Sequence, residues 1–220
     1  SYAETVKLMG RVAAALQRTD LRPHGLVIGA HRPLPTAHPR RGPGTVVHPG
    51  AMTTEDTGSG ERHDLLETLA KHRGFLRHAV EGVTDEQARS HPTVSELSLG
   101  GLVKHVARVE TNWANFIVDG PEQPDEARYA AHAASFVMQE DETLAELLAA
   151  YEEVAARTDD LVRTLPSLDA DQPLPDAPWF PPGARWSARR VFLHVIAETA
   201  QHAGHADIIR EAIDGSKTMG

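Results

Sequence analysis

From Glu61 onward, the apolar residues of this chain recur every three or four positions, which is the period of one face of an α-helix. Four stretches with this period are long, and they cover residues 61–81, 98–120, 141–165 and 187–213. We find no strand pattern of comparable strength. Because amphipathic helices bury their apolar stripes most simply against one another, the sequence predicts an all-α protein.

Residues with known capping preferences stand at the ends of these stretches. Ser98 and Ser187 precede the second and the fourth stretch as N-cap candidates. Gly120 and Gly215 follow the same two stretches, where glycine commonly ends a helix. Between the first and second stretches, residues 84–87 (TDEQ) offer a capping box, which predicts a further short helical turn.

Two long connections separate the last three helices. Residues 121–140 are polar and mixed, and residues 168–185 carry five prolines, so we expect loops in both places. Four helices with long second and third connections are typical of an up-down four-helix bundle. We therefore predict that architecture.

The first 51 residues differ from the rest in charge and composition. They hold seven Lys/Arg against two Asp/Glu, a net charge of +5, which leaves −14 for the remainder of a chain whose total is −9. They also contain six prolines, and only residues 2–16 have a helical pattern. We expect residues 1–51 to be a flexible or leader-like arm without assigned function, and residues 52–220 to form the domain.

Thirteen histidines and no cysteine stand out in the composition. The lack of cysteine excludes disulfides, thiolate metal sites, iron–sulfur clusters and cysteine nucleophiles. The net charge of −9 argues against general nucleic-acid binding, and no apolar run approaches the roughly 18 residues of a membrane span. We expect a cytoplasmic protein that binds neither nucleic acid nor membrane, in which imidazole and carboxylate would have to hold any metal.

The fourth helix gathers candidate ligands on one face. With about 100° per residue, His194, Glu198, His202 and His205 fall within an arc of roughly 80°. Apolar residues are interleaved with this arc, which indicates that part of it faces inward, where a carboxylate needs a partner. Residues four apart on one helix can chelate one ion, and His105 of the second helix, in an apolar run, is the obvious third ligand.

The same residues also suit a protein without metal. A histidine on an apolar face is commonly a hydrogen-bonded core residue, and Glu198 with His202 could form an ordinary i,i+4 ion pair. The residues alone leave both interpretations open.

Two segments resemble a known family. Residues 198–207 (ETAQHAGHAD), continuing to Gly215, and residues 98–105 (SLGGLVKH), followed by Glu110 and Trp113, resemble DinB-like proteins. The closer resemblance is to the branch grouped with mycothiol-dependent maleylpyruvate isomerase and related thiol S-transferases. It extends over about residues 61–215.

The resemblance implies a four-helix bundle that holds one divalent ion, zinc or nickel, and that could form a homodimer. In the family, a histidine of the second helix and an H-x-x-x-H or E-x-x-x-H pair of the fourth bind the ion. By position, these ligands are His105, Glu198 and His202. Three protein ligands leave an open position, which is the catalytic rather than the structural arrangement.

Three more residues of the fourth helix are candidates for the site. His205 could replace Glu198 as a ligand, or it could support the ligands through a hydrogen bond. His194 could line the pocket or make a structural hydrogen bond. Arg210 could meet a substrate carboxylate, or pair with an aspartate of its own helix.

Other residues are assigned to the core or the surface. We expect three aromatic residues in the core: Trp113, Tyr151 and Trp186. We expect five histidines at the surface: His63, His72, His78, His91 and His132.

The resemblance implies a metal-dependent enzyme that uses a low-molecular-weight thiol such as mycothiol for S-transfer to, or isomerisation of, a small electrophile. The thiol would bring the sulfur that the chain lacks. Two alternatives stay open: a non-catalytic metal-binding stress-response bundle, and a metal-assisted hydrolase. The sequence leaves open the electrophile, the choice between zinc and nickel, and the oligomeric state.

Overall fold

The computed structural model describes residues 54–123, 125–177 and 180–218. The predictions made for residues 1–51 lie outside these ranges. The division of the chain into an arm and a domain beginning at residue 52 therefore stays a prediction.

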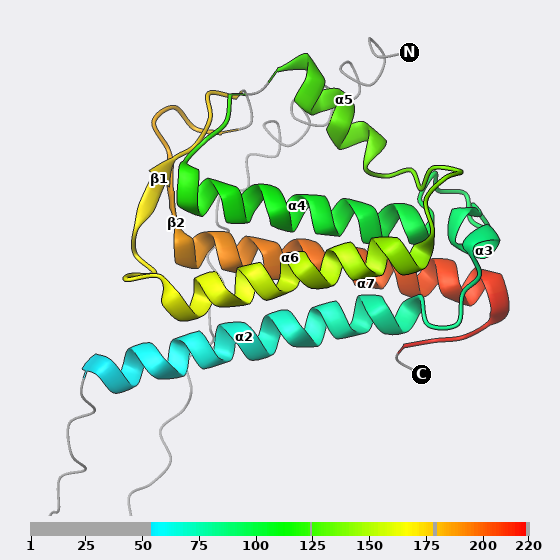
Figure 1. Cartoon of the computed structure of the whole chain (residues 1–220), viewed down its shortest axis with the longest axis horizontal. Coiled ribbons are helices and arrows are strands. Elements are labelled where there is room, and N and C mark those ends of the chain that lie inside the picture. The colour runs from blue at the N-terminus through cyan, green and yellow to red at the C-terminus, as the bar shows by residue number, and fades with distance from the viewer. Residues whose placement is uncertain (1–53, 124, 178–179, 219–220) are drawn as a thin grey trace, which may run out of the picture. The chain divides into compact units, whose positions relative to one another are not determined.

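Four long helices lie side by side and form a four-helix bundle, as predicted (Figure 1). Their bounds are α2 (Thr54–Ala79), α4 (Leu99–Asp119), α6 (Leu144–Thr164) and α7 (Ala188–Asp214). Helix α2 packs against α6 and α7, and α4 packs against the same two helices. Helices α2 and α7 run in one direction and α4 and α6 in the other, because a long connection returns the chain to the end at which α4 began (Figure 1). The bundle itself is as predicted, but the consecutive long helices α4 and α6 are parallel, so the simple up-down order that we expected was wrong.

The predicted caps of α4 and α7 are confirmed. The hydroxyl of Ser98 accepts from the amide of Gly101, and the hydroxyl of Ser187 caps α7 in the same way. Gly120 and Gly215 end these helices with φ of +82° and +81°, a backbone conformation that glycine adopts without strain. The capping box at residues 84–87 also forms, and it begins the short helix α3 (Asp85–Arg89).

The two other long helices differ from the prediction at their N-termini. Helix α2 begins at Thr54, seven residues before the predicted start at Glu61. Helix α6 begins at Leu144 rather than at residue 141, because Thr143 and Glu146 form a capping box that fixes the start.

Both long connections hold secondary structure that we did not predict. Helix α5 (Glu126–Ala134) occupies the middle of the first, where Asp125 caps an alanine-rich segment. In the second, β1 (Asp171–Pro173) pairs antiparallel with β2 (Arg185–Ser187). Three-residue strands are too short to show an alternating pattern, so the expectation of two plain loops was wrong.

Apolar side chains fill the bundle in two clusters. One surrounds Leu102, Val106 and Tyr151, and the other surrounds Phe116 and Phe192. Tyr151 is fully buried, as predicted. Trp113 and Trp186 are instead half-buried and stack on each other, with ring centroids 4.8 Å apart.

An ion pair lies inside the bundle. Arg73 of α2, 3% exposed, donates to both carboxylate oxygens of Glu110 of α4, which is 0% exposed, at 2.5 and 3.3 Å. It also donates to Asp159 of α6 at 2.7 Å. Although burial opposes the charged form, these two carboxylates raise the pKa of Arg73 above its usual value. One guanidinium therefore connects three of the four helices.

The chain that follows α5 approaches the first turn of α4 closely. A Cβ atom on Gly101 would lie 2.0 Å from the carbonyl oxygen of Phe136, and one on Gly100 would lie 2.3 Å from the sulfur of Met138. Only glycine permits this approach. The contact places Ser135 and Phe136 over α4.

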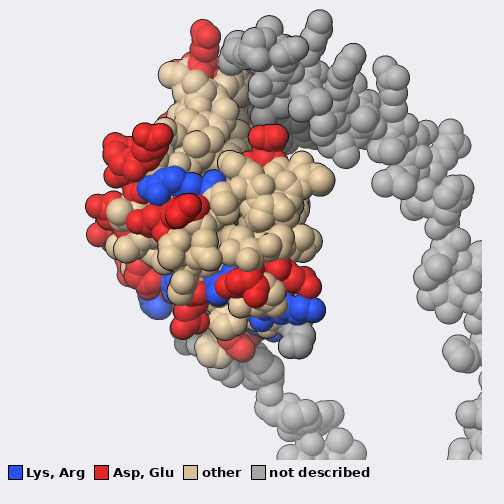
Figure 2. Space-filling view, turned by 90° about the vertical axis from the view of Figure 1, so that its right-hand side faces the viewer, with Lys and Arg blue, Asp and Glu red and all other residues tan. Residues whose placement is uncertain are grey.

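Among the described helices, none combines the length and the apolar character that crossing a bilayer requires. Figure 2 shows the end of the bundle at which α3 lies, where acidic side chains are prominent and basic ones stand between them. This agrees with the acidic composition.

We predict that Arg73→Met lowers the free energy of unfolding by about 3–5 kcal/mol, because it leaves the charge of Glu110 buried without a partner. Urea denaturation followed by circular dichroism measures the change. The double variant Arg73→Met/Glu110→Leu should regain most of the loss. Arg163→Met, which removes an exposed partner of Asp159, is the control and should change stability by less than about 1 kcal/mol. Equal losses in the single and double variants would contradict the prediction.

We also predict that Gly101→Ala destabilises the protein by about 1–3 kcal/mol, because the backbone carbonyl of Phe136 must move away. Thermal unfolding measures the effect. Gly74→Ala is the matched control: its Cβ has no neighbour within 4 Å on α2, so alanine should stabilise the helix by up to about 1 kcal/mol. A stabilised Gly101→Ala variant would show that the contact does not constrain the chain.

Candidate metal centre

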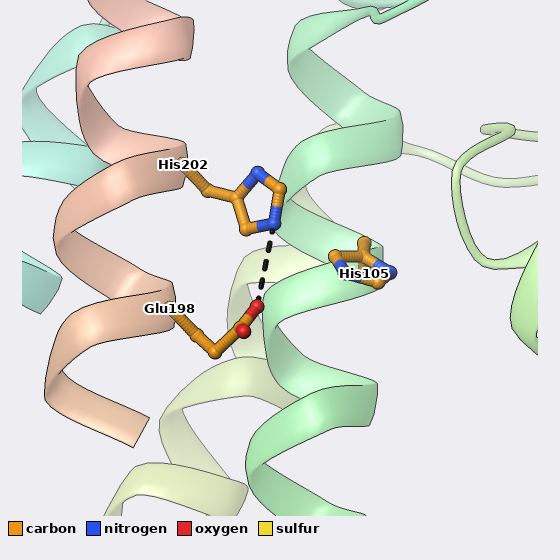
Figure 3. A group of neighbouring side chains, drawn as sticks. All are labelled: His105, Glu198 and His202. Carbon is orange, nitrogen blue, oxygen red and sulfur yellow. Dashed lines mark ion pairs between the residues drawn. The ribbon is translucent and has the colours of Figure 1, made fainter. Parts of the chain in front are cut away.

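The packing of α4 against α7 brings three of the predicted residues together. His105 of α4 faces Glu198 and His202, which lie one turn apart on α7 (Figure 3). One ligand atom of each lies within 4.8 Å of the other two, and His202 Nε2 is 3.7 Å from a Glu198 oxygen. Both imidazoles are buried and Glu198 is half-buried. Among the described residues, no other group of three potential ligands comes this close.

A hydroxyl from outside the bundle holds the ring of His105. Nδ1 of His105 lies 2.9 Å from Ser135 Oγ, which itself lies 2.6 Å from the backbone carbonyl of His132. Because the carbonyl can only accept, the hydroxyl donates to it and accepts from Nδ1–H. This network assigns the proton to Nδ1 and leaves the lone pair of Nε2 free. Phe136 stacks on the ring with centroids 3.7 Å apart and limits its rotation.

The electrostatics favour the forms in which these side chains bind metal. Burial, with the neighbouring His202 and His132, lowers the pKa of His105 to about 3, so its imidazole is neutral. The imidazole of His202 lowers the pKa of Glu198, an effect that outweighs its partial burial. Two imidazoles and one carboxylate form a donor set suited to zinc and to nickel. The residues fit a divalent ion, and their role as ligands stays a prediction.

His194 lies on the other side of Glu198. Its Nε2 is 3.7 Å from Glu198 Oε1. Its ring makes T-shaped contacts with Trp113 and Trp186, with ring centroids 4.9 and 5.1 Å apart. Burial lowers the pKa of His194, although Glu198 opposes the shift. The rings of the two tryptophans and His194 thus pack together beside the Glu198 carboxylate.

His205 and Arg210 lie farther along α7. His205 Nδ1 is 3.4 Å from His202 Nδ1, a hydrogen bond that leaves the Nε2 of His202 directed to Glu198. Arg210 donates to Asp214 at 2.9 Å and to two carbonyl oxygens at the end of α2 at 3.2 and 2.7 Å. The structure therefore does not bring Arg210 to the other candidates.

Helix α5 supplies residues that the sequence analysis missed. His132, expected at the surface, is half-buried, with its ring 5.2 Å from that of His105. Burial and the charge of Arg108 lower the pKa of His132. The i,i+4 spacing of His132 and Phe136 would have signalled a helical face, but the expectation of a loop concealed it. Three of the other histidines expected at the surface are exposed: His63, His78 and His91.

A family model described as Mycothiol-S-transferase matches residues 64–215, which include α4, α7 and the three candidate ligands. The chain belongs to the mycothiol-S-transferase family. The predicted resemblance, which extended over about residues 61–215, is thereby confirmed. No curated protein sequence matches the chain.

Two solved structures are similar to this member of the family. One is YfiT from Bacillus subtilis, described as a probable metal-dependent hydrolase with an unusual four-helix bundle topology; it is 18% identical, with a TM-score of 0.53, over 79% of this chain and 96% of YfiT. The other is a conserved protein from Enterococcus faecalis, 16% identical, with a TM-score of 0.46, over 76% of this chain and 100% of that one. The likeness to YfiT confirms the four-helix bundle.

We predict that Ser135→Ala weakens zinc binding about 10- to 100-fold, because the Nδ1–H of His105 loses its acceptor and the ring can turn. Competition with a chromophoric chelator measures the affinity, and circular dichroism checks the fold. Ser216→Ala, which removes an exposed hydroxyl, is the control. Unchanged zinc affinity in Ser135→Ala would show that this hydroxyl does not orient a ligand.

Proposed function

We propose that this protein is a divalent-metal-dependent enzyme in which His105, Glu198 and His202 hold one zinc or nickel ion. The observation that carries the proposal is the meeting of these side chains from two helices, around one point, in a largely buried place. A half-buried carboxylate beside two buried imidazoles is destabilising without a common partner. A shared cation compensates them.

The proposed cosubstrate is a low-molecular-weight thiol such as mycothiol. Membership of the mycothiol-S-transferase family supports this, and the chain has no cysteine of its own. A divalent ion bound by three protein ligands has an open position, at which it lowers the pKa of a thiol and supplies a thiolate. The reaction proposed is transfer of the thiol to a small electrophile, or isomerisation of that electrophile.

The chain's own residues would bind and shield the reactants. Ser135 and Phe136 hold the ring of His105 in one orientation, so its lone pair keeps one direction. The packed rings of Trp113, Trp186 and His194 stand beside Glu198 and would limit the directions from which a reactant approaches it. No residue is assigned as general base.

Metal analysis tests the proposal. We predict about one zinc or nickel ion per chain in the wild-type protein, measured by plasma mass spectrometry, and loss of that ion in His105→Ala/His202→Ala. His78→Ala, which removes an exposed histidine, is the control. If the wild-type protein holds no ion even after reconstitution with zinc or nickel, the proposed function is wrong.

Cobalt substitution separates an open, thiol-binding ion from a purely structural one. A small thiol should produce a sulfur-to-cobalt charge-transfer band in the cobalt protein, whereas a structural site without an open position gives none. Glu198→Ala should lose activity and largely keep its melting temperature. A large fall in melting temperature would instead favour a structural ion.

Light scattering tests the expected homodimer.

A further inference from the structure

A stripe of half-buried polar residues runs along α4 from the candidate metal centre. Arg108, Asn112 and Asn115 follow His105 at intervals of three, four and three residues, which places all four on one helix face. At 1.5 Å per residue, this stripe is about 15 Å long. Three of these side chains are not needed to hold a metal ion.

Arg108 has no partner within the described part of the chain. Its Nε is buried and makes no hydrogen bond. Two other arginines with buried nitrogens have acceptors: Arg73 has two carboxylates, and Arg62 has carbonyl groups at the end of α6. Nη2 of Arg77 is also buried without a hydrogen bond, but it forms an ion pair with Glu152. A guanidinium nitrogen that is removed from water without an acceptor is destabilising. The Nε of Arg108 therefore lacks an acceptor that the described residues could have provided.

Arg108 is close enough to the metal centre to act on it. It lies one turn after His105 on α4, and its charge contributes to the lowered pKa of both His105 and His132. An anion beside Arg108 would thus lie next to the candidate ligands without replacing one of them.

A pocket continues the stripe beyond Arg108. Its volume is about 230 Å³, and it begins at Asn112, one turn after the arginine. Asn115, Trp113 and Phe180 are also in its lining, together with the ion pair of Glu122 and Arg128, so it combines amide and charged groups with aromatic surface. Such a lining suits a small organic molecule with a few polar groups.

We propose that Arg108 binds a carboxylate of the substrate, so that the site takes a small carboxylate-bearing molecule whose remainder lies along α4 in this pocket. A planar guanidinium pairs with a carboxylate through two parallel hydrogen bonds, a geometry that a lysine cannot reproduce. Glu198 repels anions near the metal centre, and Arg108 compensates for that repulsion. A role of this contact in catalysis rests on the proposed function. The binding of the carboxylate by Arg108 does not depend on that function.

Calorimetry with succinate as the probe, and with uncharged succinamide as its isostere, tests the inference in the zinc-loaded and the metal-free protein. We expect succinate to bind at least 10-fold more tightly than succinamide in both forms of the wild type. Arg108→Met should abolish this preference, and Arg108→Lys should retain a small part of it. Arg157→Met, which removes an exposed cation of α6, is the control and should behave as the wild type.

The outcomes also separate this inference from the proposed function. Succinate that binds equally well to Arg108→Met and to the wild type would overturn the inference, as would a wild type without preference for succinate over succinamide. Binding that requires zinc and does not depend on Arg108 would likewise overturn it, because the ion would then hold the carboxylate. Preference for succinate in a protein that never binds a thiol would support Arg108 and refute the thiol enzyme.

Discussion

The buried ion pair between Arg73 and Glu110 constrains this bundle more than any single apolar contact. Apolar side chains can slide past one another at modest cost, whereas a buried charge that loses its partner destabilises the fold by several kcal/mol. Because Arg73 also reaches Asp159, the pair fixes α2, α4 and α6 relative to one another. Fixing the rotation of α4 also fixes the direction in which His105 points, and thus the position of the candidate metal centre.

The connection between α4 and α6 completes that centre. It crosses the first turn of α4 where Gly100 and Gly101 leave room for it. It then delivers the hydroxyl of Ser135 and the ring of Phe136 to His105. A segment with the composition of a loop thus orients a candidate ligand and covers the candidate site. The same helix α4 presents two asparagines to the pocket and carries Arg108 one turn before them, so one face of one helix serves both the proposed metal and the proposed substrate.

The sequence predicted the bundle because each long helix has an apolar stripe and, at α4 and α7, clear caps. It also predicted the three residues that meet at the centre: Glu198 and His202 from their i,i+4 spacing, and His105 from its place in an apolar run and from the family resemblance. The prediction failed for the short helix and strands, whose sequences are too brief to show a periodic pattern. Helix α5 has nine residues and the strands three each, too few for a period to emerge. His132 was assigned to the surface for the same reason.

What the sequence by itself determined is therefore local: the helices, their caps and the spacing of the candidate ligands Glu198 and His202 on α7, all of which depend on residues within four positions of one another. What the tertiary structure alone decided is which side chains meet across elements. The acceptor for His105, the stacking of Trp113 on Trp186 and the missing partner of Arg108 depend on how each helix turns about its axis when the core is buried. Residues far apart in the sequence set that rotation together, so no single segment contains it.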